Sequence, residues 1–342
     1  MSGKITFCGN ILVDSVKTIT SWPEQGMLVP ITGVRRSVGG CVCNTGVDLK
    51  ILDPSVEVRA NGKVGTDDAG NFAVSVLESK GVDCSQVRRI EGVPTTFTDV
   101  MSVEGTGERT FFNMHGADSR LLPEDIEVEK LGCDIFHLGY LLLLDGLDAP
   151  DRQYGTKAAR LLAAVRAAGI KTSVDIVSEQ SKRFPEIVRP ALRHCDYLVV
   201  NEIEGSLATG IPCRGADGQV SAAVLLEIAK ALFALGVREK VVLHCPEMSV
   251  CRSADGETCV VPSLELPPDW IRGTVGAGDA FCAGMLYSFL SGLSDEAGMR
   301  LASCAAAANL TATDSISGAM SLKDTLELET RFARRKISKG LV

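Results

Sequence analysis

Short apolar segments alternate with longer segments of helical periodicity through the second half of the chain. We predict strands at 135–138, 172–176, 197–200 and 240–244, and helices at 158–168, 185–193 and 222–235. Apolar strands separated by amphipathic helices are typical of a parallel sheet that carries helices on both faces. The pattern therefore predicts an α/β fold with a doubly wound, mainly parallel sheet.

The first third of the chain adds strands that do not fit this alternation. Residues 4–13 and 56–64 read as apolar strands of the main sheet, but 18–38 is broken by prolines and glycines, and 95–114 reads as a hairpin whose turn carries Gly105 and Gly107. We expect one domain over residues 1–342, with strands of a small second sheet inserted at about 15–38 and 95–114. A small sheet must cover one of its faces, so we expect it to lie over the substrate cleft as a lid and to pair with a second subunit in a homodimer.

Composition excludes several classes of protein. The 342 residues are 45% hydrophobic with a mean hydropathy of +0.16, which is typical of a compact soluble protein. A net charge of −8 and a pI near 5.2 argue against a surface for nucleic acid or an anionic membrane. No apolar run approaches the roughly 20 residues of a membrane span, and no leader peptide is evident, so we expect a cytoplasmic protein. The 12 cysteines are scattered and suggest reduced, mostly buried thiols instead of a metal site.

The segment Gly273–Phe281, Gly-Thr-Val-Gly-Ala-Gly-Asp-Ala-Phe, carries the strongest chemical signal. Small residues at Gly276, Ala277 and Gly278 allow a tight turn, and the apolar helix that follows would direct free N–H groups at it. Such a turn binds anions. A carboxylate at Asp279 would repel a bound phosphate unless it accepts the proton of an attacking hydroxyl, as phosphoryl transfer requires. The alternative is that Asp279 caps the helix.

Other polar residues follow apolar strands, where ligands of α/β sheets gather. Asp14 follows the first strand, Asp175 a later one, and Asn201 and Glu204 stand after the strand at 197–200. Asn44 stands at the start of a helix opened by Gly39-Gly40. Each of these residues could instead be a loop or helix cap. Asp145, after an apolar run at 141–144, is a weaker candidate.

Gly273–Gly284 resembles the C-terminal signature of the ribokinase/PfkB carbohydrate kinase family. Further segments match the family in the same order: 9–14, 39–44, 62–70, 81–83, 116–117, 201–204 and 318–319. The resemblance implies ATP as phosphoryl donor and Mg²⁺ as cofactor. It makes Asp279 the base and places the anion hole at the backbone of Gly276, Ala277 and Gly278. It assigns sugar hydroxyls to Asp14, Gly40 and Asn44. It assigns the nucleotide to Thr274, Asn201 and Glu204, with Mg²⁺ held near Glu204 through water.

The chain departs from the family at several positions. Cys41 stands where a ribokinase more often has Lys, and Leu12 where it has Asn, which disfavours ribose. The segment His244-Cys245-Pro246 lacks the Gly of the family's Thr-x-Gly and leaves the nucleotide contacts open. Gly273 replaces an Asp that often helps hold a monovalent cation, so activation by K⁺ is left open.

We interpret the chain as an ATP-dependent kinase for a hydroxyl of a sugar or related small polyol. Two alternatives remain: a nucleoside kinase on the same fold, and a regulator that binds sugar or nucleotide without turnover. A dinucleotide-binding oxidoreductase fits worst, because the Gly-x-Gly lies near the C-terminus.

A phosphorylated acceptor would need a cationic clamp, for which Arg35, Arg36 and Arg109 are candidates. Alternation places Arg35 and Arg36 on opposite faces, and Arg109 closes a hairpin turn where we expect it to be solvated. Asp14 would also repel a phosphate placed near it, so we expect an unphosphorylated sugar or a nucleoside.

Overall fold

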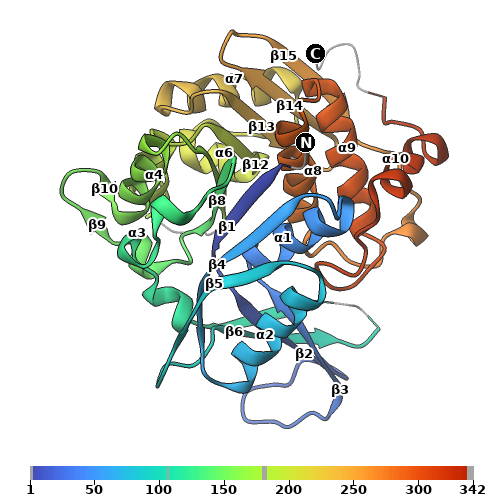
Figure 1. Cartoon of the computed structure of the whole chain (residues 1–342). Coiled ribbons are helices and arrows are strands. Elements are labelled where there is room, and N and C mark those ends of the chain that lie inside the picture. The colour runs from blue at the N-terminus through green and yellow to red at the C-terminus, as the bar shows by residue number, and fades with distance from the viewer. Residues whose placement is uncertain (1–2, 106–107, 179–182, 337–342) are drawn as a thin grey trace.

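The computed structural model describes residues 3–105, 108–178 and 183–336 (Figure 1). Within these ranges nine strands form one sheet in the order β15-β14-β13-β12-β11-β8-β1-β4-β5, and the strands from β13 to β5 are parallel to their neighbours. Their bounds are β1 Lys4–Gly9, β4 Glu57–Gly65, β5 Asp83–Ile90, β8 Ile135–Leu141, β11 Lys171–Ile176, β12 Tyr197–Asn201, β13 Lys240–His244, β14 Met248–Ser253 and β15 Thr258–Pro262. β14 and β15 are antiparallel additions at one edge.

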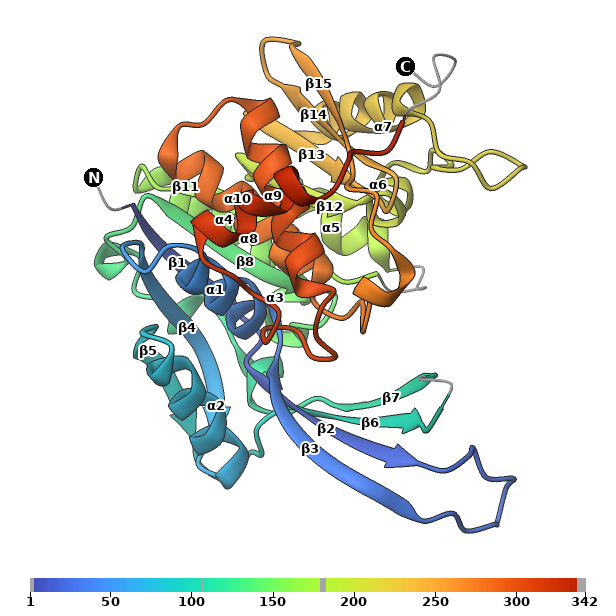
Figure 2. The same ribbon diagram turned by 90° about the vertical axis from the view of Figure 1, so that its right-hand side faces the viewer.

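Helices cover both faces of this sheet, as Figure 2 shows. One layer contains α1 Cys41–Leu52, α2 Asp68–Ser79, α8 Ala277–Ser291, α9 Asp295–Asn309 and α10 Leu322–Arg331. The other contains α3 Asp145–Asp148, α4 Lys157–Ala167, α5 Phe184–Leu192, α6 Glu202–Thr209 and α7 Ala222–Leu235. The pleat of β12 explains why both faces are covered: Leu198 and Val200 pack with the second layer, and Val199 packs with the first. The predicted doubly wound α/β fold is confirmed.

A second sheet, which we call the lid sheet, projects from the main body (Figure 2). It has the order β3-β2-β6-β7, with β2 Leu12–Ile19, β3 Ile31–Gly39, β6 Phe97–Val103 and β7 Arg109–Met114. β2 runs antiparallel to β3 and parallel to β6, and β6 runs antiparallel to β7. Gly105 adopts a positive φ just after β6, whereas Gly107 lies outside the described residues.

The single strand predicted at 4–13 is wrong, because the chain changes sheets within it. β1 ends at Gly9, whose φ is 137°, and β2 begins at Leu12 in the lid sheet. An ideal Cβ at Gly9 would lie 1.8 Å from the carbonyl oxygen of Gly139, so only glycine allows this close approach to β8. Asp14 consequently lies inside β2 of the lid sheet and not at the end of a central strand of the main sheet.

The burial of the cysteines agrees with the sequence-based expectation. All 12 cysteines are free thiols, and most are buried. None of the helices in the described ranges combines the length and the apolar content that a bilayer span requires.

Candidate active site

The glycine-rich turn leads into the N-terminus of α8. Gly276 is the N-cap residue with φ 83°, and an ideal Cβ there would lie 2.7 Å from atoms of Ser315. The amide of Ala277 makes a long contact of 3.4 Å to the carbonyl of Thr274. The amides of Gly276 and Gly278 have no hydrogen-bond acceptor among the described residues. Free N–H groups at a helix N-terminus attract anions.

Asp279 lies in the first turn of α8, but it does not cap the helix, because the N-cap is Gly276 and no side chain accepts there. Its carboxylate instead accepts hydrogen bonds from three side chains. The hydroxyl of Tyr140 donates to Oδ1 at 2.6 Å, the hydroxyl of Thr45 to Oδ1 at 3.2 Å, and Nδ2 of Asn44 to Oδ2 at 3.1 Å. The donors come from β8 and α1, so two elements distant in sequence fix the orientation of one carboxylate.

Two opposing effects act on the pKa of Asp279. Burial raises it, while the hydrogen bonds from Tyr140, Asn44 and Thr45 lower it. The net pKa lies above the ordinary value for Asp. A raised pKa brings a carboxylate closer to the value that suits a base near neutral pH.

Asn44 is held by partners on every side. Its Oδ1 accepts from the hydroxyl of Ser315 at 2.7 Å, and its Nδ2 donates to Asp279 and, at 3.3 Å, to the hydroxyl of Tyr140. Only 6% of the residue is exposed. Asn44 therefore orients Asp279 in this structure, and its contact with a substrate hydroxyl stays a prediction.

A cavity of about 250 Å³ opens where the parallel strands end. It is lined at the ends of β8, β11, β12 and β13 by Tyr140, Asp175, Asn201 and His244, and by Glu204, Gly278 and Asp279 from the helices that follow. The carboxyl ends of parallel strands are the usual place of ligands in α/β sheets. Asp175, Asn201 and Glu204 thus lie with Asp279 around one space.

Asn201 and Glu204 form a reciprocal capping box at the start of α6. Oδ1 of Asn201 accepts from the amide of Glu204 at 2.8 Å, and Oε2 of Glu204 accepts from the amide of Asn201 at 2.9 Å. Oε1 of Glu204 accepts from Nδ2 of Asn201 and from the hydroxyl of Ser178, each at 2.8 Å. Burial raises the pKa of Glu204 to about 7. Capping and cavity lining coexist here, and a role in nucleotide binding stays a prediction.

The carboxylates around the cavity fit a magnesium ion held through water. Burial raises the pKa of Asp175, and the charges of Asp279 and Glu204 raise it further. Burial also raises the pKa of Glu204, to which the charge of Asp279 adds. A divalent cation would relieve this repulsion, and oxygen donors are the ligands it prefers. Both oxygens of Glu204 already accept hydrogen bonds, so bridging water molecules suit this site better than direct ligation by Glu204.

His244 occupies the position where the family resemblance fails. Its ring stacks on Phe281 with centroids 4.5 Å apart, and an ideal Cβ on Gly278 would lie 3.6 Å from its Cε1. Burial lowers the pKa of His244 to about 4, so the ring is neutral at pH 7. A neutral imidazole can accept or donate a hydrogen bond beside the glycine-rich turn.

Asp14 and Gly40 lie at the junction between the lid sheet and α1. An ideal Cβ on Gly39 would lie 2.6 Å from Oδ2 of Asp14, and Gly40 is the N-cap residue of α1 with φ 88°. Burial raises the pKa of Asp14 to about 6, whereas a hydrogen bond with Thr98 and the charge of Arg109 lower it. The two glycines allow the carboxylate to approach the start of the helix that carries Asn44.

Three further residues singled out in the sequence are Thr274, Asp145 and Arg109. Thr274 is exposed in the turn before α8. Asp145 pairs with His115 at 2.8 Å and does not line the cavity. The sequence suggested that Arg109 is solvated in a turn, but the structure differs. Arg109 begins β7, is partly buried, and donates from Nη2 to the carbonyl of Thr313 at 3.0 Å.

Sequence reasoning did not identify Tyr140, Thr45 or Asn10. Oδ1 of Asn10 accepts from the amide of Tyr140 at 2.7 Å, which holds the end of β8 in place. Asn10 and Tyr140 are polar residues near the ends of apolar strands, the same signal that singled out Asp175. Thr45 carries no such signal, because it follows Asn44 inside a helix.

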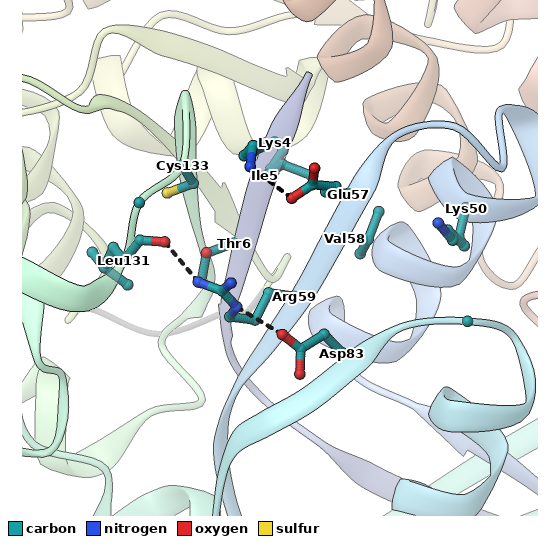
Figure 3. Close-up of a pocket in the computed structure, with 12 residues that line it drawn as sticks. Lys4, Ile5, Thr6, Lys50, Glu57, Val58, Arg59, Asp83, Leu131 and Cys133 are labelled. Carbon is teal, nitrogen blue, oxygen red and sulfur yellow. Dashed lines mark hydrogen bonds and ion pairs between the residues drawn. The ribbon is translucent and has the colours of Figure 1, made fainter. Parts of the chain in front are cut away.

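A separate cavity of about 180 Å³ lies at the opposite edge, where the strands begin (Figure 3). Four of its charged groups form ion pairs: Lys4 with Glu57 at 2.9 Å, and Arg59 with Asp83 at 3.0 Å. Nη1 of Arg59 also donates to the carbonyl of Leu131 at 2.7 Å. The remaining cation, Lys50, donates to the carbonyls of Pro54 and Val56, each at 2.8 Å, so the cavity at the carboxyl edge is the stronger candidate for the active site.

Comparisons with known proteins match this chain over most of its length. A model of the pfkB family carbohydrate kinases matches residues 4–321. A ribokinase from Arabidopsis thaliana is 26% identical over 323 residues, which cover 94% of this chain and 79% of the relative. An ATP-dependent ribose-1-phosphate kinase from Halopiger xanaduensis is 25% identical over 292 residues, which cover 84% of this chain and 85% of the relative.

Solved structures show the same fold. The structure of Arabidopsis thaliana ribokinase complexed with ribose and ATP superposes with a TM-score of 0.75 at 21% identity. The match covers 96% of this chain and 99% of that chain.

Proposed function

The chain belongs to the pfkB family of carbohydrate kinases, and on that premise we propose that it transfers the γ-phosphoryl group of ATP to a hydroxyl of a sugar or a related small polyol. The observation that carries this proposal is the carboxylate of Asp279. It is oriented by Tyr140, Thr45 and Asn44 and lies directly beside the free amides of the turn before α8.

In the proposed reaction, Asp279 accepts the proton of the acceptor hydroxyl as its oxygen attacks the γ-phosphorus. The amides of Gly276, Ala277 and Gly278 stabilise the negative charge that develops on the transferred group. The N–H of Ala277 makes only a long contact of 3.4 Å to the carbonyl of Thr274, which a phosphate oxygen would replace. Rigid positioning contributes most of the rate, because phosphoryl transfer needs little covalent participation from the protein.

We assign the nucleotide to the cavity at the carboxyl edge. Asn201 and Glu204 would arrange its phosphates, Thr274 would contact it from the turn, and bound Mg²⁺ would neutralise charge on the phosphates near Glu204. His244 presents a neutral ring to this space, so it can contact the nucleotide without adding charge.

We assign the acceptor to the space between Asp14, Gly40 and Asn44, beneath the lid sheet. Closing this sheet over the acceptor would exclude water, which would otherwise hydrolyse ATP. We treat the chain as one domain with an inserted lid. Apolar residues exposed on the lid sheet and its loop, including Leu28, Val34 and Phe112, support pairing with the lid of a second subunit.

The names of the relatives do not choose the acceptor, since one acts on ribose and another on ribose 1-phosphate. A nucleoside presents the same sugar hydroxyls to Asp14 and is the alternative acceptor. A coupled assay of ADP release tests the proposal over free sugars, polyols, sugar phosphates, sugar acids and nucleosides, with and without K⁺. We expect one of these classes to be phosphorylated. If none releases ADP above the rate without acceptor, while ATP and a sugar still bind, the chain is a regulator without turnover.

A further inference from the structure

The strand register of the lid sheet defines which side chains face the active site. Asp14 pairs with Ser37 on β3 and with Thr98 on β6. Residues paired across neighbouring strands share one face of a sheet, and every second residue along a strand returns to it. The face that carries Asp14 therefore also carries Val16, Thr18, Arg35, Ser102 and Arg109, since Val16 pairs with Arg35, Thr18 with Ser102, and Ser102 with Arg109.

A second cleft, of about 340 Å³, is lined by this face of the lid sheet. Its lining includes Val16, Thr18, Arg35, Ser102, Arg109 and Thr313. Two guanidinium groups thus face one space in a chain whose net charge is −8. No carboxylate of the described residues lines the cleft.

The two arginines are free to receive a ligand. Arg35 is exposed and has no ion-pair partner among the described residues. Arg109 uses one N–H for the carbonyl of Thr313, which fixes its guanidinium and leaves further N–H groups available. Two cations on the opposite face of the lid sheet already have partners. Arg36 lies over the ring of Phe72 at 4.9 Å, and Lys17 pairs with Asp99 at 2.5 Å.

This cleft adjoins the proposed reaction centre. Thr313 lies against Gly273, because an ideal Cβ built on Gly273 would be 3.1 Å from the Cα of Thr313. Ser315, in the same loop, packs against Gly276, and its hydroxyl donates to Asn44. Asp14 pairs with Ser37 on β3, and Arg35 lies two residues from Ser37 along this strand, which corresponds to about 7 Å. An acceptor that places a hydroxyl near Asp14 and Asn44 would extend its far end toward Arg35 and Arg109.

We propose that the acceptor carries an anionic group, a phosphate or a carboxylate, which Arg35 and Arg109 bind at the end opposite the reacting hydroxyl. This inference rests on the proposed kinase function. Guanidinium groups match both anions in geometry, and two of them provide the clamp that a phosphorylated or acidic sugar requires. The sequence-based expectation was an unphosphorylated sugar or a nucleoside. That expectation assumed a solvated Arg109, whereas the structure turns Arg109 toward the same cleft as Arg35.

The test compares kcat/KM for sugar phosphates, sugar acids and their neutral parent sugars in the wild-type protein and in Arg35→Gln, Arg109→Gln and Arg36→Gln. We expect an anionic acceptor to be preferred, and the phosphate and acid series to show which anion is used. Each of Arg35→Gln and Arg109→Gln should lower kcat/KM for that acceptor by about 10- to 100-fold, as expected when a hydrogen bond to a charged group is lost. Arg36→Gln, a matched change on the opposite face, should alter it less than about fivefold.

A binding measurement separates this inference from the proposed function. Calorimetric titration of the same sugar phosphates, sugar acids and parent sugars into the protein without nucleotide requires no turnover. Tighter binding of the anionic member that is lost in Arg35→Gln supports the subsite even if no acceptor is phosphorylated, which would overturn only the kinase proposal. Equal or tighter binding of neutral sugars overturns the inference. A preference for anions that survives in both Arg35→Gln and Arg109→Gln overturns it as well.

Discussion

Replacement of Tyr140 by Phe tests whether the hydrogen bonds around Asp279 set its basicity. The hydroxyl of Tyr140 donates to Oδ1 of Asp279 at 2.6 Å, the shortest of the three contacts to this carboxylate. This hydrogen bond stabilises the charged form and lowers the pKa of Asp279, which burial raises. Tyr140→Phe removes the hydroxyl and keeps the ring, so the pKa of Asp279 should rise further.

The size of the shift follows from the strength of the contact. A hydrogen bond to a charged group contributes about 1.5–3 kcal/mol, and about 1.4 kcal/mol corresponds to one pKa unit. The expected rise is therefore about 1–2 pKa units, at the lower end if Thr45 and Asn44 tighten their contacts. Because a base is active only when deprotonated, the acidic limb of the pH profile of kcat/KM should move to higher pH by the same amount.

The assay is ADP release with the preferred acceptor, measured across pH for the wild type, Tyr140→Phe and the control Tyr154→Phe. Tyr154 lies beside His194, with ring centroids 5.7 Å apart, and does not line the cavity at the carboxyl edge. ATP titrates identically in all three reactions, so a difference between them reports on the protein. An acidic limb in Tyr140→Phe that coincides with that of the wild type would refute the reasoning.

Three further changes test other parts of the structure. Gly276→Ala should lower Tm and kcat more than Gly292→Ala does. The two glycines share a positive φ, but only at Gly276 would an ideal Cβ lie 2.7 Å from Ser315. Equal effects of the two substitutions would argue against a packed turn at Gly276. Asn201→Ala should cost about 0.5–2 kcal/mol of unfolding free energy through the lost cap and should raise KM for ATP; an unchanged KM would remove Asn201 from the nucleotide site. The pKa of buried Asp48 is raised above its unfolded value, so its contribution to stability is present at low pH and is lost as pH rises through the folded-state pKa. Asp48→Asn should therefore raise Tm at pH 8 but not at pH 4, and a uniform change in Tm would contradict this.

The alternation of strands and helices made the main sheet predictable. The ranges predicted for β13 and α7 coincide with the observed elements, because each is bounded by a clear change of hydrophobic period. The passage from β1 to β2 was not predictable in the same way. Residues 5–13 are all buried and mostly apolar, which conceals the point at Gly9 where the chain leaves one sheet for another.

The candidate site was predictable where a residue's local position signals its chemistry. The glycine-rich turn, Asp279 and the polar residues at strand ends carry such signals. The partners of Asp279 do not, because Tyr140 is separated from it by 139 residues and Thr45 by 234, and only the fold brings them together. The same holds for Arg109, whose hydrogen bond to Thr313 spans 204 residues.

The most direct measurement of the central claim is transfer of the γ-phosphoryl group from labelled ATP to the acceptor by the wild type and by Asp279→Asn. Asn is nearly isosteric with Asp but cannot accept the proton, and general-base catalysis contributes about 10²–10⁴-fold. We predict that kcat falls by at least this factor while ATP and the acceptor still bind with affinities close to those of the wild type. Turnover by Asp279→Asn at the wild-type rate would contradict the role of Asp279 as the base.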